Sequence, residues 1–222
     1  MSNSKIRRRT ALLLVPLAAV VLTACGNNDE SAEQTQAAPA APTSSPAASA
    51  ADQAPLSCEG QTIDTAAPIH YRAETLIKAP LSKVWSLHTD VERWSQWQDA
   101  VATIERLDQG PLRPGSQFHW TTPVPATNIT PAATLSITSS IQNIEENKCT
   151  RWTGPAESEA VNIDSGTHVW NFTEVDGGVL VRTEENWRGA QAEADVPTSI
   201  NFLGEGLEVW LAALKAKAEA AN

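Results

Sequence analysis

The chain has few basic residues and few cysteines, and each shortage excludes a class of protein. Its 16 Lys and Arg are outnumbered by 26 Asp and Glu, which gives a net charge of −10 at pH 7. Nucleic acid repels a chain this acidic, so we expect no nucleic-acid partner. The three cysteines and four scattered histidines show no metal-ligand spacing, and we predict neither a metal nor a cofactor.

Two common catalytic patterns are also missing from the sequence. No glycine-rich phosphate loop follows a predicted strand, and no serine lies in the context of a nucleophile elbow. The usual nucleotide-binding and hydrolase chemistries are therefore not supported.

An uncharged run near the N-terminus is too short to span a membrane. It covers residues 11–22 and follows a basic patch at residues 5–9, whereas a spanning helix needs about 20 residues. This order is typical of a secretion signal. The run ends in Leu22-Thr23-Ala24-Cys25, which resembles the lipobox of bacterial lipoproteins. The resemblance implies that residues 1–24 are cleaved and that Cys25 carries lipid such as palmitate; the alternative is a plain secretory signal with an incidental cysteine.

Residues 25–56 are predicted to form a disordered tether. They are rich in Ala, Pro, Ser and Gln and cannot bury enough apolar surface to fold. Cleavage of the signal removes four of the 16 basic residues and none of the 26 acidic ones, which leaves a net charge of −14. Anionic headgroups repel such a chain, so membrane attachment has to come from the acyl chains. We expect an extracytoplasmic protein, anchored in the cell envelope at Cys25.

Residues 57–222 have the size of one domain and contain all eight tryptophans, enough for a sizeable core. Cys58 and Cys149 remain once Cys25 is acylated. In an oxidising envelope, an even pair of cysteines far apart in sequence predicts a disulfide, and two free thiols are the alternative.

The periodicity of this domain predicts an α+β fold. A strand at residues 69–77 stops before Pro80, and two short helices follow, one from Leu81 and one at residues 91–97. Further strands are predicted at residues 101–107, 116–121, 133–144, 148–153, 166–174 and 179–187, with turn residues between them. We expect about seven strands in a curved antiparallel sheet.

The last element is predicted to be a long helix that opens near Val196. Apolar residues recur along it at steps of three and four. This stripe indicates that the helix packs against the sheet. Gly204 and Gly206 interrupt the stripe and predict a bend or a close approach. A sheet curled around this helix leaves a space that side chains or a ligand can fill.

Seven segments carry a further signal: residues 77–85, 89–97, 115–120, 151–154, 168–172, 176–178 and 182–185. In this order they resemble the START-like (SRPBCC) superfamily, most closely its polyketide cyclase/dehydrase-like branch, over about residues 69–219. The resemblance implies a helix-grip (START/Bet v 1-like) fold with a deep, mostly apolar pocket between the sheet and the C-terminal helix. It implies no universal catalytic residue.

Side-chain alternation selects candidate residues for that pocket. His168 shares one strand face with two aromatic residues, and Glu185 shares a face with Trp187 on the next strand. In a dry pocket, His168 and Glu185 can act as acid and base, as cyclisation of a polyketone needs. The alternative is a satisfied histidine, with the glutamates paired to Arg182 or Arg188. The candidate ligand-binding residues, for which plain core packing stays open, are Trp120, Trp152, His168, Trp170, Phe172 and Trp187. Trp94 on the second short helix and Trp210 on the long helix are predicted to be core residues that pack these helices on the sheet.

Three functions are consistent with these patterns. The first is a membrane-tethered protein that binds a small hydrophobic ligand, namely a lipid, a polyketide or an aromatic compound. The second is a polyketide cyclase/dehydrase-like enzyme that uses His168 and Glu185. The third is an interaction module of the envelope. The absence of a complete catalytic constellation favours the first.

Overall fold

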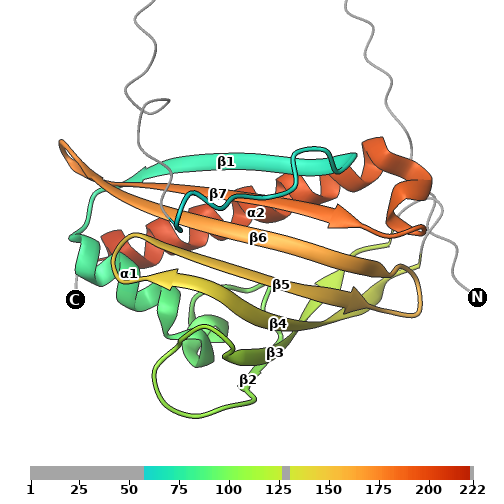
Figure 1. The fold of residues 1–222 in the computed structure, drawn as a ribbon, viewed down its shortest axis with the longest axis horizontal. Coiled ribbons are helices and arrows are strands. Elements are labelled where there is room, and N and C mark those ends of the chain that lie inside the picture. Colours follow the sequence, from blue (N-terminus) through green and yellow to red (C-terminus); the bar gives the residue numbers. More distant parts are fainter. Residues whose placement is uncertain (1–57, 127–130, 221–222) are drawn as a thin grey trace, which may run out of the picture. The chain divides into compact units, whose positions relative to one another are not determined.

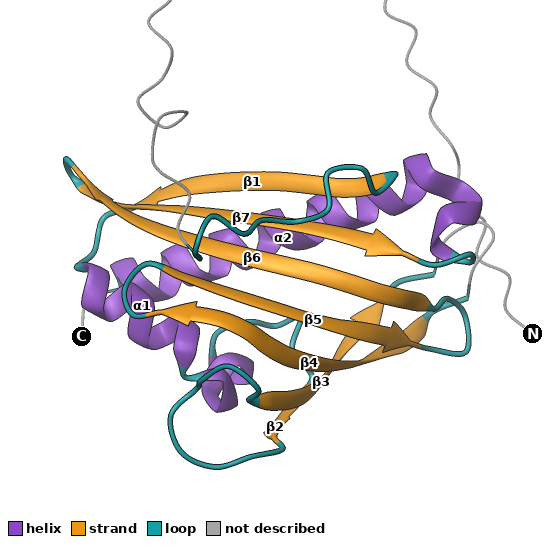
Figure 2. Ribbon diagram, viewed as in Figure 1, coloured by secondary structure: helices purple, strands orange, loops and turns teal. Residues whose placement is uncertain are grey.

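A long C-terminal helix lies along one face of a curved, seven-stranded antiparallel sheet (Figure 1). The computed structural model describes residues 58–126 and 131–220, and the strand order is β1-β7-β6-β5-β4-β3-β2. The strands are β1 (Ile69–Ile77), β2 (Thr103–Arg106), β3 (Gln117–Val124), β4 (Ala133–Glu145), β5 (Cys149–Glu157), β6 (Ile163–Val175) and β7 (Gly178–Arg188). The helices are α1 (Leu81–Thr89), α2 (Val196–Glu219) and two short 3₁₀ helices, η2 (Val91–Gln96) and η3 (Ala192–Asp195) (Figure 2).

The predicted α+β helix-grip architecture is confirmed. β1 pairs with β7, and α1 and η2 carry the chain from the end of β1 to β2 at the opposite edge of the sheet. From β2 onward each strand pairs with the next as an antiparallel meander. Because the chain starts at one edge and returns to it, β1 and β7 lie together beside α2.

The predicted signal at residues 1–24, the lipidated Cys25 and the tether at residues 25–56 lie outside the described residues. They therefore stay predictions. Within the described part of the chain, no helix is long and apolar enough to cross a bilayer.

Three strands extend beyond their predicted ends by three or more residues. β5 continues to Glu157, β6 begins at Ile163 and β3 continues to Val124. For β5 and β3, the predicted ends lie close to residues that normally end strands, namely Gly154, Pro155 and Pro123. A register shift between Gly154 and Ala156 absorbs the irregular residues, so the β5–β6 ladder continues beyond them.

The helix α2 begins where the sequence predicted and buries the predicted stripe. The Asp195 carboxylate caps it by accepting hydrogen bonds from the backbone N–H and the hydroxyl of Thr198, at 3.2 and 2.8 Å. Gly204 marks a close approach, since a Cβ there would lie 2.9 Å from the Tyr71 ring. The buried residues of α2 are Leu203, Gly204, Leu207, Trp210, Leu211, Leu214 and Ala218.

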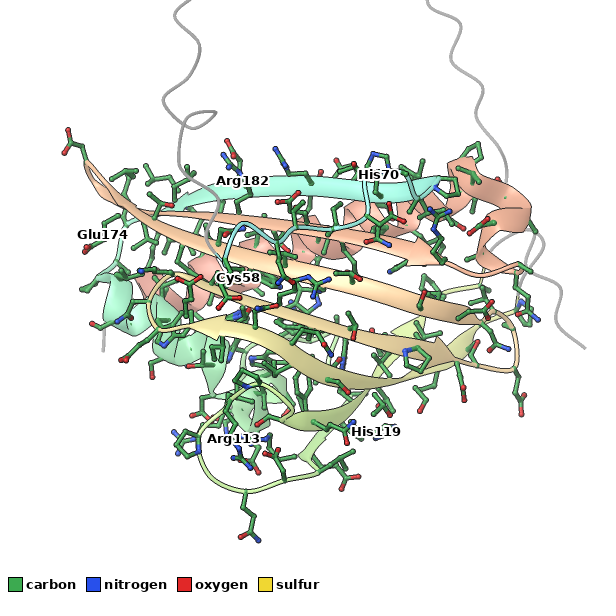
Figure 3. All side chains as sticks on the ribbon, in the orientation of Figure 1. Cys58, His70, Arg113, His119, Glu174 and Arg182 are labelled. Atoms are coloured by element: carbon green, nitrogen blue, oxygen red, sulfur yellow. A yellow bond between two sulfur atoms is a disulfide. The ribbon has the colours of Figure 1, made fainter. Side chains whose placement is uncertain are left out.

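Residues 58–68, here called the N-terminal arm, cross the face of the sheet opposite to α2 (Figure 1). The predicted disulfide is confirmed: Cys58 is bonded to Cys149 of β5, with a Cα–Cα distance of 5.6 Å. Cys58 lies over this outer face in Figure 3. Further along the arm, the Asp64 backbone N–H donates to Asn186, and Arg188 donates to the Asp64 carboxylate at 2.8 Å. The arm is thus fixed at both ends.

Candidate functional site: a tryptophan-lined cavity

A cavity of about 340 Å³ lies between α2 and the inner face of the sheet. It exists because α2 packs mainly against β1 and β7, which leaves the inner face of β3 to β6 only partly covered. Its floor contains Gly154 and Gly166. The volume lies within the range of small-molecule sites, about 300–1,000 Å³.

The cavity opens to the surface between α2 and the end of β3. Gly206 and Val209 line it from the helix, and Val209 is 52% exposed. Pro123, Val124 and Pro125 line it from the strand side. A Cβ added at Gly206 would have no neighbour within 4 Å, so this turn of the helix faces open space.

Six of the eight tryptophans line the cavity: Trp94, Trp120, Trp152, Trp170, Trp187 and Trp210. Three of these rings are nearly perpendicular to one another. The angle is 90° between Trp94 and Trp120, 78° between Trp94 and Trp210 and 89° between Trp120 and Trp210, with centroids 4.9–6.4 Å apart. These rings therefore pack edge to face against one another in the cavity wall.

A polar cluster lies on the β6–β7 side of this cavity. His168 and Glu185 are direct partners in the β6–β7 ladder, and His168 Nδ1 lies 3.2 Å from Glu185 Oε2. The other ring nitrogen, Nε2, is 2.7 Å from the Thr183 hydroxyl. Trp187 Nε1 donates to Glu185 Oε1 at 2.8 Å. Strand alternation and the β6–β7 register together bring these groups to one face.

Burial controls the protonation of this cluster. It raises the pKa of Glu185 to about 7, against a smaller opposing effect of the Trp187 hydrogen bond. Burial also lowers the pKa of His168 well below its usual value, and the nearby His88 adds to this lowering. Below pH 7 the neutral pair is therefore favoured, with the Glu185 carboxyl donating to Nδ1 and Nε2–H donating to Thr183.

His88 also lines the cavity, although the sequence patterns did not select it. It projects from α1 into the cavity wall, and its Nε2 lies 2.8 Å from the Thr150 hydroxyl. Burial lowers its pKa to about 3, so the ring is neutral at pH 7. Its ring stacks on Trp152, with centroids 5.8 Å apart. The only sequence signal was its position on the apolar side of a short helix.

Five of the six predicted ligand-binding residues line the cavity, and Phe172 does not. Phe172 shares the inner face of β6 but lies beneath α1, where its ring packs edge-on against Trp85 at 5.4 Å and contacts His88. β6 extends beyond the cavity. Its inner face therefore contributes Trp170 to the cavity wall and Phe172 to the packed core.

The expectation for Trp94 and Trp210 was incomplete. Both were predicted to pack the core, and they are buried, with exposed fractions of 1% and 9%. Both also line the cavity, because η2 and α2 face the sheet across it. Further lining residues missed by the sequence reasoning come from β4, including Leu135 and Ile137, whose signal was the alternation of that strand.

The alternative pairing of Glu185 with arginine is wrong. Arg182 and Arg188 lie on the outer face of β7, where they pair with Glu74 at 3.0 Å and with Asp64 at 2.8 Å. Among the described residues that line the cavity there is no Lys or Arg; the ionisable ones are His88, His168, Glu185 and Glu205. Elsewhere in residues 58–126 and 131–220, no three His, Cys, Asp or Glu side chains gather as metal ligands would.

Comparison with known proteins gives one family match and several structural matches. Residues 68–219 match the model of the family described as polyketide cyclase/dehydrase and lipid transport. No match was found among curated protein sequences.

The fold is similar to that of several solved structures. A START superfamily protein from Mycobacterium smegmatis has 13% identity and a TM-score of 0.53, covering 68% of this chain and 97% of its own. The protein TTHA0849 from Thermus thermophilus has 16% identity and a TM-score of 0.53, over 67% of this chain and 96% of its own. Ara h 8.0201 has 14% identity and a TM-score of 0.52, over 67% and 96%. At these identities the likeness shows the fold.

Proposed function

Because the chain belongs to the polyketide cyclase/dehydrase and lipid transport family, we propose that its domain binds a small hydrophobic molecule between the sheet and α2. The observation that carries this proposal is the open cavity of about 340 Å³, walled by six indoles, at the centre of the fold. Protein interiors are normally close-packed, so an apolar cavity of this size supports the binding of a ligand. The candidate classes are a lipid, a polyketide and an aromatic compound.

Cavity blocking tests this proposal. Gly206→Phe places a ring in the open space beside the helix, where no atom lies within 4 Å of the new Cβ. Ala212→Phe is the matched control, since Ala212 is an exposed residue of the same helix and does not line the cavity. The neutral dye N-phenyl-1-naphthylamine should bind the wild type and the control, and lose about tenfold or more in affinity with Gly206→Phe. Equal binding to both variants would refute the proposal.

The natural ligand is accessible by extraction. Full-length protein purified from its native host should yield a small organic compound by mass spectrometry, and Gly206→Phe should yield none. An empty extract from the wild type and from the Ala212→Phe control would favour an interaction module over a binding protein.

A second proposal concerns location and rests on the sequence alone. The leader and Leu22-Thr23-Ala24-Cys25 support a lipid anchor on Cys25 at the cell envelope. An anchored domain reaches no farther than its tether allows, so its ligand is taken up close to a membrane. Cys25→Ser should move the protein from the membrane fraction to the soluble fraction. Retention of this variant in the membrane fraction would contradict lipid anchoring.

The contact between His168 and Glu185 favours one alternative function, a polyketide cyclase/dehydrase-like enzyme. A carboxyl with a pKa near 7 beside a neutral imidazole suits general acid–base catalysis. With the extracted compound as substrate, His168→Gln should then abolish turnover while ligand binding changes little. Equal loss of binding and turnover would assign His168 a positioning role.

A further inference from the structure

The charges around the cavity are all of one sign. Glu185 lies on its β7 side and Glu205 at its α2 side, and no Lys or Arg is among its described lining residues. His88 and His168 add no positive charge at pH 7, because burial lowers the pKa of each. A carboxylate or phosphate ligand would therefore be buried without a counter-charge, which is strongly unfavourable.

The aromatic side chains of the cavity wall favour a positively charged ligand. An indole presents a negative face, and tryptophan is the most effective aromatic partner of a cation. Six indoles line the cavity, and Trp187 among them donates its Nε1–H to Glu185 at 2.8 Å. An ammonium group in this indole-rich wall can contact an indole face, and its apolar substituents can contact the neighbouring rings.

Glu185 retains capacity to interact with a cation. Each of its oxygens has one polar contact in the described structure, Oε1 with Trp187 and Oε2 with His168, whereas a carboxylate offers about four acceptor positions. The arginines of β1 and β7 lie on the outer face of the sheet, where Arg72 pairs with Glu184, Arg182 with Glu74 and Arg188 with Asp64. The described ionisable groups on the cavity side of the surrounding elements supply no cation at neutral pH. They are His168 on β6, His88 on α1, Tyr71 on β1, and Glu205 and Glu208 on α2. Tyr71 is hydrogen-bonded to Glu208 at 2.9 Å.

We propose that the ligand of this cavity is a lipophilic organic cation, a tertiary or quaternary ammonium compound with an apolar or aromatic group. The ammonium group lies among the indoles and is neutralised by Glu185, while the apolar group contacts Leu135, Ile137 and Leu207. This inference rests on the proposed function, since the same cavity binds the ligand.

Three probes of similar size separate charge from shape. Benzyltrimethylammonium is cationic, neopentylbenzene replaces its nitrogen by carbon and is neutral, and phenylacetate is anionic. Binding to the full-length protein is measured by quenching of tryptophan fluorescence in a nonionic detergent. We expect the cation to bind about tenfold more tightly than its neutral isostere, and phenylacetate to bind most weakly.

Two variants locate the charge effect. Glu185→Gln should weaken benzyltrimethylammonium about tenfold and leave neopentylbenzene unchanged, because only the cation interacts with the ionised carboxyl. Glu105→Gln is the control, since Glu105 lies on β2 and does not line the cavity; it should change neither affinity. In the wild type, affinity for the cation should rise from about pH 6 to 8 as Glu185 ionises, and Glu185→Gln should abolish this rise.

The outcomes separate this inference from the function on which it rests. If neopentylbenzene binds as tightly as the cation, or if Glu185→Gln weakens both probes equally, the inference of a cationic ligand is overturned and hydrophobic binding stands. If no probe binds and N-phenyl-1-naphthylamine also fails to bind, the proposed function itself is overturned.

Discussion

Glu185 Oε2 lies 3.2 Å from His168 Nδ1, and one proton lies between two groups whose charged forms are both disfavoured by burial. Neither group has an arginine or lysine beside it in the described cavity wall. The pair is therefore the most pH-sensitive part of the cavity near neutrality, and its ionisation affects both stability and ligand choice.

The first prediction concerns the pH dependence of stability. The pKa of Glu185 is raised from 4.5 to about 7, so the folded protein keeps a proton that the unfolded chain releases. The stabilisation from this group is complete below pH 4.5 and is lost as pH rises to about 7. Between about pH 5 and 8, the wild type should lose up to about 3 kcal/mol of unfolding free energy through this group. Glu185→Gln should not show this loss.

Urea denaturation at both pH values measures the effect. Glu92→Gln, at an exposed position, is the control and should follow the wild type. If the unfolding free energies of Glu185→Gln and the wild type differ by the same amount at both pH values, the pKa of Glu185 is not raised.

The second prediction compares two glycines in the cavity floor. A Cβ at Gly154 would lie 2.0 Å from the Thr138 carbonyl oxygen, so the β4 and β5 backbones would have to separate. At Gly166 the nearest atoms lie at 3.5 Å, which is an ordinary contact. Gly154→Ala should cost about 3 kcal/mol of unfolding free energy and Gly166→Ala less than about 1 kcal/mol. Similar thermal stability of the two variants would contradict this reading of the floor.

The third prediction compares two glycines of α2. Gly204 faces the Tyr71 ring at 2.9 Å, whereas nothing lies within 4 Å of a Cβ at Gly206. Gly206→Ala should stabilise the protein by about 0.5–1 kcal/mol through helix propensity. Gly204→Ala displaces Tyr71 and its bond to Glu208, and should destabilise by about 1–2 kcal/mol. Chemical denaturation gives both values, and the same sign for both variants would be inconsistent with the packing of α2 on β1.

The fourth prediction concerns the disulfide. Cys58 and Cys149 are 91 residues apart, so their bond restricts a long loop in the unfolded chain. The double variant Cys58→Ser/Cys149→Ser should lose roughly 2–5 kcal/mol of unfolding free energy. Reduction of the wild type should produce the same loss, and should leave the double variant unchanged. Full stability after reduction would mean that the arm is fixed by its hydrogen bonds alone.

The sequence predicted the strands, the turns between them and the side chains that share a strand face, because these depend on alternation and on turn residues. Alternation placed His168 on one strand face with Trp170 and Phe172, and Glu185 on one face of the next strand with Trp187, because side-chain direction within a strand follows from parity alone. The sequence could not predict where along such a face the cavity ends. Trp170 lines it and Phe172, two residues later, lies under α1, a difference set by the path of another element.

Residues contributed from separate elements were the hardest to assign. His88 on α1 reaches the cavity only because α1 packs under β6, and a nine-residue helix gives no signal of its final neighbours. Trp94 and Trp210 were predicted to be core residues because apolar stripes do not distinguish a packed interface from the wall of a cavity. Gly154 similarly ended a predicted strand, although its true role is to let β4 and β5 approach closely.

The attachment of Cys58 to β5 also has a mechanical consequence. β5 is the central strand of the seven, with three strands on either side. Tension in the chain before residue 58 enters the fold through the covalent bond to Cys149 and reaches the middle of the sheet. It bypasses the hydrogen bonds of the arm and the β1 edge strand, so pulling on the N-terminus does not peel the sheet from its edge or spread the walls beside α2.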